Sequence, residues 1–365
     1  MVFGLFKKKK KQSKDDRYLT LTIKEVNQIA KDTANVVFHQ PEEAFDYQPG
    51  QFITVIAEIG GKKIRRAYSL CTTPFEDVNP AITVKRVPDG LMSNHVHDYF
   101  NAGDEIEVME PMGMFTTQFD ESNERHAVFF GGGSGITPLI SIIRSCLIKE
   151  PKSRITLVFA NRAKEYIAFY ELLSNLQSKF QDRFNVIHVL EDDPESVADY
   201  TGRLTPSLVV DICDKIGVSP ATEFYICGPE PMMNIVDEGL KSNAIKPDQI
   251  RMESFEAGKT SPIDVVAEEA SGEISSSEVT ILMDGQEHVI QVPGNTTILD
   301  AGLDNDLDMP YSCQSGLCTA CRGKCLEGEI SLDDAEGISK EEIEEGYRLL
   351  CVGKPKSEKI RVEIG

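Results

Sequence analysis

The sequence predicts a multidomain protein in which an all-β block, an α/β block with a parallel sheet and a small cysteine-bearing block follow one another. The apolar pattern changes its period along the 365 residues, a small and polar stretch precedes the last block, and four cysteines fall within residues 313–325. A chain of this length forms two or three domains, each able to bury a core. The predicted division is a basic, disordered tail at 1–17, a β domain at 18–118, an α/β domain at 119–256, a linker at 257–277 and a third domain at 278–365.

The β domain is predicted from short apolar or alternating runs with Pro and Gly turns between them. These runs are FITVIAEIG (52–60), RRAYSLCT (65–72) and AITVKRV (81–87). Between 126 and 255 the rhythm changes, and strand-like runs such as HAVFFG and ITLVFA alternate with helical patterns such as ITPLISIIRSCLIKE. Alternation of strand and helix favours a parallel α/β sheet.

Composition excludes several classes of function. A formal charge of −21 argues against general nucleic-acid binding. No apolar run reaches the roughly 18 residues of a membrane span, and the start MVFGLFKKKKK lacks the order of a signal peptide. We expect a cytoplasmic protein whose clustered cysteines serve metal binding or catalysis. The run Lys7–Lys11 is interpreted as a solvated tail, with contact to an anionic surface as the alternative.

The cysteine run CQSGLCTACRGKC holds Cys313, Cys318, Cys321 and Cys325, and 29 residues lie between Cys321 and the later Cys351. Zinc favours two separated C-x2-C pairs, which are absent, and the run of a four-iron cluster has a shorter first gap and a proline at its end. The spacing C-x4-C-x2-C with a distant fourth cysteine is typical of plant-type two-iron clusters. Strand spacing carries Cys325 roughly 13 Å beyond Cys321, which predicts that Cys325 is not a ligand.

Two motifs in the β domain suit a phosphate-bearing cofactor. In the strand-like run RAYS (66–69), Arg66 and Tyr68 share one face, where a guanidinium suits a phosphate and a ring can lie against a flavin; an ordinary strand is the alternative. In DGLMS, Gly90 and Ser93 open an expected helix, whose free N–H groups suit a pyrophosphate. A pyrophosphate indicates FAD instead of FMN.

Two further motifs in the α/β domain suit a nucleotide. GGGSGITP (131–138) and CGPEPMM (227–233) each follow a strand-like run and open a helix, where phosphates bind. The strand that ends in FANRAKE carries Arg162, which favours a 2′-phosphate and therefore NADPH. Glu165 lies close enough in sequence to leave NADH possible.

Together these motifs resemble two known families. The ordered set RAYS, GLMS, GGGSGITP, CGPEPMM and ESF is similar to the ferredoxin-NADP reductase superfamily, and residues 278–365 resemble a plant-type [2Fe–2S] ferredoxin of the β-grasp fold. The resemblance implies an antiparallel FAD-binding β-barrel, an NAD(P)-binding α/β domain and an α+β ferredoxin domain. The fusion resembles the reductase subunits of bacterial phenylacetyl-CoA epoxidases, which implies a place in phenylacetate catabolism.

The resemblance also implies roles for single residues. Arg66 and Ser93 would hold the FAD phosphates, Tyr68 would lie against the isoalloxazine, and Ser69 would bond near flavin N5. The catalytic set is Ser69, Cys227 and Glu253. The other cofactor-binding residues are Leu70, Gly90, Met92, Gly132, Gly133, Thr137, Arg162, Gly228 and Pro229. The implied iron ligands are Cys313, Cys318, Cys321 and Cys351.

The expected function is that of an NAD(P)H-dependent reductase. Electrons would pass from nicotinamide through FAD and the [2Fe–2S] cluster to a partner oxygenase, which we predict to be the di-iron phenylacetyl-CoA epoxidase. The alternatives are a Rieske oxygenase or hybrid-cluster protein as partner, or a non-catalytic electron carrier or redox sensor. The third domain has 18 acidic and 8 basic residues, which suits a basic partner or only solubility. The carboxylates predicted to steer a partner are Asp304, Asp306, Asp308, Glu341, Glu342, Glu344 and Glu345.

Overall fold

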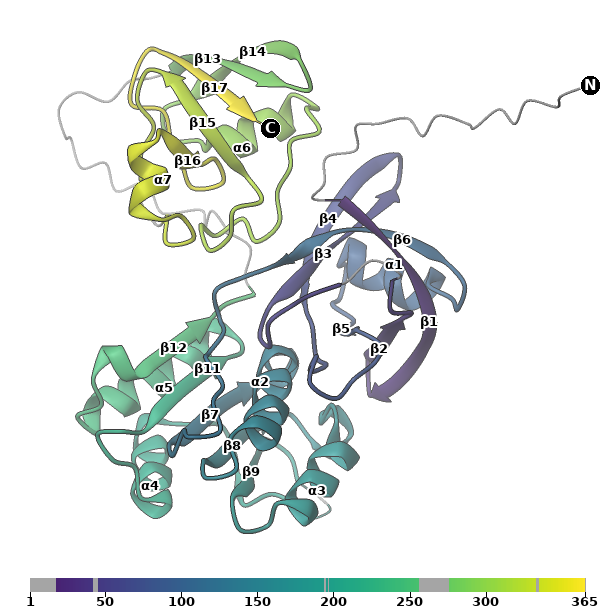
Figure 1. Ribbon diagram of the computed structural model, residues 1–365, viewed down its shortest axis with the longest axis vertical. Coiled ribbons are helices and arrows are strands. Elements are labelled where there is room, and N and C mark those ends of the chain that lie inside the picture. Colours follow the sequence, from purple (N-terminus) through teal and green to yellow (C-terminus); the bar gives the residue numbers. More distant parts are fainter. Residues whose placement is uncertain are drawn as a thin grey trace, which may run out of the picture.

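The computed structural model describes most of the chain beyond its first 17 residues. The described residues are 18–41, 45–193, 195, 197–255, 276–332 and 335–364. Figure 1 shows three bodies in chain order, coloured purple to blue, teal to green, and light green to yellow. The predicted tail with Lys7–Lys11, and the predicted linker up to residue 275, lie outside the described residues.

The first body is an antiparallel six-stranded barrel. Its strands are β1 (Tyr18–Ala30), β2 (Thr33–Phe38), β3 (Phe52–Ile59), β4 (Lys62–Ser69), β5 (Ala81–Lys85) and β6 (Glu105–Met112). Their order is β4-β3-β6-β1-β2-β5, and a bridge between Leu70 and Ile82 joins the two edges. Helix α1 (Leu91–Tyr99) buries Met92 and Val96 in the barrel core. Residues of β4, of β5 and of the start of α1 lie around one pocket.

The second body is a parallel sheet covered by helices on both faces (Figure 1). Its strands are β7 (His126–Gly132), β8 (Arg154–Asn161), β9 (Phe184–Leu190), β10 (Tyr200–Thr201), β11 (Glu223–Cys227) and β12 (Ile250–Glu253). Its α-helices are α2 (Ile136–Lys149), α3 (Tyr170–Lys179), α4 (Pro206–Ile216) and α5 (Glu230–Ser242). Single 3-10 turns are η1 (Gly133–Gly135), η2 (Lys164–Tyr166) and η3 (Pro247–Gln249).

The strand order of this sheet places its crevice. The strand order is β10-β9-β8-β7-β11-β12. From β7 the chain adds β8, β9 and β10 on one side and then returns to add β11 and β12 on the other, so the order of the parallel strands reverses between β7 and β11. In open α/β sheets, ligands bind at the carboxyl ends of the strands on either side of such a reversal. The GGGSGITP and CGPEPMM motifs stand at those two ends, as the sequence predicts.

The third body is a mixed five-stranded sheet with two short helices. Its elements are β13 (Ser276–Met283), β14 (Gln286–Pro293), α6 (Ile298–Asp304), β15 (Arg322–Glu327), α7 (Lys340–Glu344), β16 (Tyr347–Leu349) and β17 (Lys359–Ile364). The order is β14-β13-β17-β15-β16, with β13 and β17 parallel and the other neighbours antiparallel. Strand β13 begins at Ser276, so the last two residues of the predicted linker belong to the sheet.

The predicted fold class is confirmed: an antiparallel barrel, a parallel α/β sheet and a small α+β body follow one another. Across the described ranges, no helix combines the length and apolar character that a bilayer crossing needs.

Candidate functional site

A pocket of about 310 Å³ opens between the barrel and the start of α2. Predicted cofactor-binding residues that line it are Arg66, Tyr68, Ser69, Gly90, Met92, Ser93 and Thr137. Leu70, which the sequence also assigned to the cofactor, is fully buried in the barrel core. The pocket also contains Thr83, Lys85 and Phe255, which the motifs did not indicate.

The geometry of this pocket suits a phosphate-bearing ligand. Helix α1 begins at Leu91 with no side-chain cap, so its first N–H groups are left for a ligand. The Ser93 hydroxyl accepts a hydrogen bond from the Val87 N–H at 3.1 Å, which closes the turn in front of the helix. Burial raises the pKa of Tyr68, so its hydroxyl stays neutral. These features fit the pyrophosphate and ring of a dinucleotide such as FAD.

A second pocket, of about 400 Å³, lies at the reversal point of the parallel sheet. Of the predicted nucleotide residues, Gly132, Gly133, Arg162 and Pro229 line it. Glycine is required here because the turns after β7 and β11 touch. A Cβ on Gly132 would lie 2.5 Å from the Met232 sulfur, and one on Gly228 would lie 3.1 Å from the Gly132 nitrogen.

Charged and polar groups that the motifs did not indicate surround Arg162 in the second pocket. The Arg162 guanidinium lies 5.2 Å from the centre of the Tyr166 ring, and Arg203 pairs with Glu191 at 3.1 Å. Within the described chain, the buried Asn161 side-chain nitrogen has no hydrogen-bond partner. Arg203 lies in a loop far along the chain, so no local motif indicated it, whereas Asn161 directly precedes Arg162 and could have been found.

Cys227 and Glu253 end the neighbouring strands β11 and β12, where they lie side by side in register. Both are buried, and one Glu253 carboxylate oxygen has no hydrogen-bond partner among the described residues. Burial, and secondarily the charge of Cys313, raises the pKa of Glu253 to about 8. Burial and the neighbouring Glu253 raise the pKa of Cys227, so its thiol stays protonated. Glu253 therefore lies near Cys313 of the cysteine-bearing loop, and Cys227 lies beside Glu253.

Four cysteine side chains converge in the third body. Hydrogen bonds from the thiols of Cys318 and Cys351 lower the pKa of Cys313, and Cys351 also contacts Cys321. Within the described chain, no group of three His, Cys, Asp or Glu side chains is arranged to hold one metal ion. A two-iron cluster instead takes two thiolates on each iron. The four thiols and the small-residue loop around them fit such a cluster.

Cys325 is directed away from these four thiols. It lies in β15, opposite Val362 of β17, and its sulfur contacts the Glu327 and Gly328 carbonyl oxygens at 3.4 and 3.6 Å. The strand expected after Cys321 is present, and Gly328 turns the chain with φ of 82°. The position of Cys325 agrees with its predicted exclusion, while the ligand set itself stays a prediction.

Comparison with known proteins gives the family. Models of the oxidoreductase FAD-binding domain, the oxidoreductase NAD-binding domain and the 2Fe-2S iron-sulfur cluster binding domain match residues 20–117, 129–238 and 281–356. A 3-ketosteroid-9-alpha-monooxygenase ferredoxin reductase component of Rhodococcus rhodochrous is 33% identical, over 95% of this chain and 97% of that protein. The chain belongs to the ferredoxin reductase family. This reductase is an FAD-, NAD- and [2Fe–2S]-binding type of oxidoreductase.

Two further relatives extend the comparison. One component of the 1,2-phenylacetyl-CoA epoxidase from Escherichia coli K12 is 28% identical to the reductase, over 94% of this chain and 97% of that protein. The solved structure of a phthalate dioxygenase reductase has a TM-score of 0.59 and 24% identity, and covers 96% of this chain and 98% of its own. The latter establishes a shared three-domain fold.

The third body of the reductase packs on the barrel through its cysteine loop (Figure 1). Phe52, Ile56 and Met109 of the barrel form one apolar cluster with Cys318 and Ala320. Ala67 of β4 packs against this cluster and also lines the first pocket. Strand β4 therefore lies between the proposed flavin pocket and the cysteines.

Three of the carboxylates predicted to steer a partner also have contacts inside the chain. Asp308 binds Arg65 at 2.7 Å and Lys63 at 3.3 Å, both in the barrel, and Asp306 lies 4.0 Å from Lys62. Glu342 binds Arg322 and caps α7. These three carboxylates therefore have partners within the reductase. The others, Asp304, Glu341, Glu344 and Glu345, are exposed.

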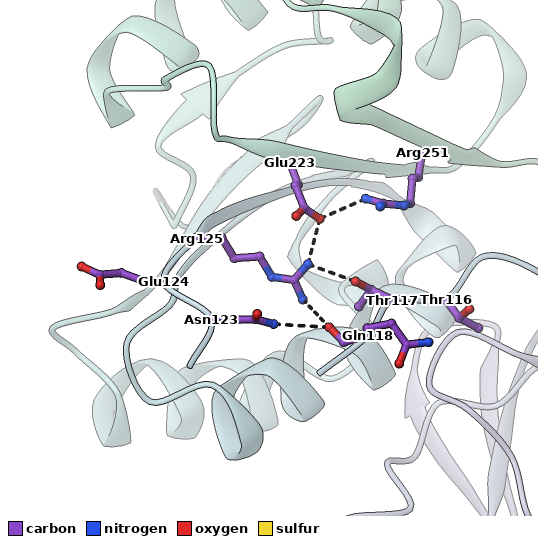
Figure 2. A pocket seen from close by; sticks show the side chains of 8 residues that line it. All are labelled: Thr116, Thr117, Gln118, Asn123, Glu124, Arg125, Glu223 and Arg251. Atoms are coloured by element: carbon purple, nitrogen blue, oxygen red, sulfur yellow. Dashed lines mark hydrogen bonds and ion pairs between the residues drawn. The ribbon is translucent and has the colours of Figure 1, made fainter. Parts of the chain in front are cut away.

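A third pocket, of about 470 Å³, lies at the opposite, amino-terminal edge of the parallel sheet (Figure 2). Arg125 binds Glu150 at 2.6 Å, Glu223 at 2.8 Å and Thr117 at 3.0 Å. Figure 2 shows Glu223 between Arg125 and Arg251. Because these charges are already paired, we assign the network to holding the segment between the first two bodies.

Proposed function

We propose that the protein is an NAD(P)H-dependent reductase that passes electrons through FAD and a [2Fe–2S] cluster to an oxygenase. One observation supports this most strongly: β4 lines the first pocket and packs against the four-thiol loop, and Lys85 lines both pockets. When bound, FAD accepts a two-electron hydride and releases single electrons, and the cluster carries one electron at a time. The protein contributes distance, orientation and exclusion of water.

The chain's own residues would divide this work. Arg66 and the first amides of α1 would hold the FAD pyrophosphate, and Tyr68 would lie along the ring. Cys227, held as a neutral thiol, would position the nicotinamide without adding charge. Glu253 would keep its carboxyl in a water-poor space beside the cysteine loop. Iron would be held by Cys313, Cys318, Cys321 and Cys351.

The test is the cofactor content and the two partial reactions of the purified protein. We expect one FAD and two irons per chain, reduction of a small dye by NADPH or NADH, and reduction of the cluster by the same nucleotide. Release of FMN, or four irons per chain, would overturn the assignment. Bound cofactors without catalytic dye reduction would favour a passive carrier or sensor.

The oxygenase partner is a separate proposal. The resemblance of the fused ferredoxin domain favours a 1,2-phenylacetyl-CoA epoxidase, whereas the higher identity belongs to a 3-ketosteroid-9-alpha-monooxygenase component. Product formation with each purified oxygenase, at equal reductase concentration, distinguishes the two. We expect the epoxidase to be supported at the higher kcat/KM. A higher value with the steroid enzyme would overturn this choice while leaving the reductase assignment intact.

A further inference from the structure

The seam between the barrel and the third body contains a buried arginine. Arg65 of β4 is 2% exposed, and its Nη1 lies 2.7 Å from the Asp308 carboxylate. Its guanidinium also lies 5.4 Å from the centre of the Tyr311 ring. Asp308 and Tyr311 belong to the segment that leads into Cys313. Arg65 therefore holds the cysteine loop from the barrel side.

Two other contacts join the barrel to the same segment of the third body. Lys63 reaches the second Asp308 oxygen at 3.3 Å, and Thr54 of β3 donates a hydrogen bond to the Ser312 hydroxyl. Lys63 is 40% exposed, so solvent weakens its attraction for Asp308. A fully buried guanidinium is different, because losing its carboxylate leaves an uncompensated charge. The Arg65–Asp308 pair is the contact that the seam depends on most.

The Arg65–Asp308 pair is linked to the first pocket because Arg65 and Arg66 are consecutive residues of β4. Arg66, the next residue, faces the first pocket, and its guanidinium donates a hydrogen bond to the Arg65 carbonyl oxygen at 2.7 Å. The residue that would hold FAD and the residue that holds the cysteine loop are therefore joined through one peptide. Movement of the loop on Arg65 would change the separation between the pocket and Cys313.

We propose that Arg65 is a positioning residue for electron transfer from FAD to the [2Fe–2S] cluster. It clasps Asp308 and so fixes the segment 308–312, and the Cys313 side of the cluster loop, against β4. This inference rests on the proposed function. A residue that served stability alone would affect both partial reactions equally, whereas a clasp affects only the transfer into the cluster.

The test separates these two reactions in the complete holoprotein. The variant Asp308→Asn removes the charge that Arg65 needs, and Asp304→Asn, in the same body, is the matched control. Rapid mixing with NADPH or NADH records flavin reduction and cluster reduction separately. In Asp308→Asn we expect flavin reduction within about twofold of wild type and cluster reduction slowed about tenfold or more. Small-angle scattering should show a larger radius of gyration for this variant only.

Each outcome of this test decides for or against the clasp. Unchanged cluster reduction in Asp308→Asn, or an equal loss in Asp304→Asn, overturns the proposal. If Asp308→Asn fails to fold, Asp308→Glu carries the same comparison, because it keeps the charge and displaces it by one methylene. Slower cluster reduction with normal flavin reduction supports the clasp, and equal rates overturn it. If the wild type shows no nucleotide-driven cluster reduction, the proposed function fails, and the scattering comparison still decides whether Arg65 holds the domain.

Discussion

At the scale of single residues, Cys351 is predicted to bind iron and Cys325 is not, although both are cysteines of the same domain. The change of Cys351 to Ser should remove or distort the cluster, because its thiol is among the four that converge. The change of Cys325 to Ser should preserve it, because that thiol contacts backbone carbonyls of its own hairpin. Iron content and the visible spectrum measure both, and FAD content is the internal control. Loss of iron from the Cys325 variant alone would show that the wrong cysteine was assigned.

Arg162 carries the predicted preference for NADPH. A charge-assisted bond to the 2′-phosphate contributes about 1.5–3 kcal/mol, which is about tenfold or more in discrimination. The ratio of kcat/KM for NADPH to that for NADH should fall by about this factor in Arg162→Ala. Arg203→Ala is the comparison, because Arg203 lines the same pocket but pairs with Glu191. An unchanged ratio in the first variant would exclude Arg162 from phosphate recognition.

At the scale of elements, Arg125 connects the chain entering β7 with the end of α2 and the start of β11. Glu150 is fully buried and binds this arginine through both carboxylate oxygens. Arg125→Ala should lower the free energy of unfolding of the second body by about 3–5 kcal/mol, because it leaves the buried charge of Glu150 without a cation. Arg251→Ala, at an exposed ion pair of the same network, should cost less than about 1 kcal/mol. Urea unfolding followed by circular dichroism compares them, and equal losses would contradict this view of the network.

His126, the first residue of β7, should make the second body sensitive to acid. Its ring bonds to Thr156 and Arg154, both at 2.9 Å, and burial, followed by the charge of Arg154, lowers its pKa to about 4. An unfolded histidine has a pKa of about 6.5. The stabilisation is therefore complete above about pH 6.5 and is lost as the pH falls toward about 4, because only the unfolded chain takes up the proton. Melting temperatures between these limits should fall more steeply for wild type than for His126→Gln, and parallel curves would refute the assignment.

At the scale of the whole molecule, the exposed carboxylates of α7 and of its C-cap residue should steer a partner protein. Glu341, Glu344 and Glu345 are exposed on the body that holds the cysteines. The rate of partner reduction should fall as salt rises, since the Debye length drops from about 10 Å at 0.1 M to about 3 Å at 1 M. Glu344→Gln should reduce the rate at low salt only. A rate that is flat across this range would assign the acidic surface to solubility.

The sequence could predict what depends on local pattern. The run RAYS indicated Arg66, Tyr68 and Ser69, all of which line the first pocket, although Ala67 between them lines it too. The turns after β7 and β11 were evident from their glycines. It could not predict that Arg65 meets Asp308, because 242 residues of chain separate them and a single charged residue has no period. For the same reason Asp308 was assigned to a partner protein, although it belongs to an internal contact. Arg203 was missed because its loop reaches the pocket only after the sheet has formed.

Ala67 has a consequence for energetics as well as for geometry. Its strand lies between the proposed flavin pocket and the cysteine cluster, so protein instead of water fills the space between two redox groups. Charges separated by protein interact more strongly than charges separated by water. Reduction of one group therefore makes reduction of the other less favourable. The midpoint potential of each group then depends on the redox state of the other. In a potentiometric titration, the midpoint potential of FAD in the Cys351→Ser protein should therefore differ from that in the wild type. The two redox groups are coupled in the same way as two interacting titratable acids.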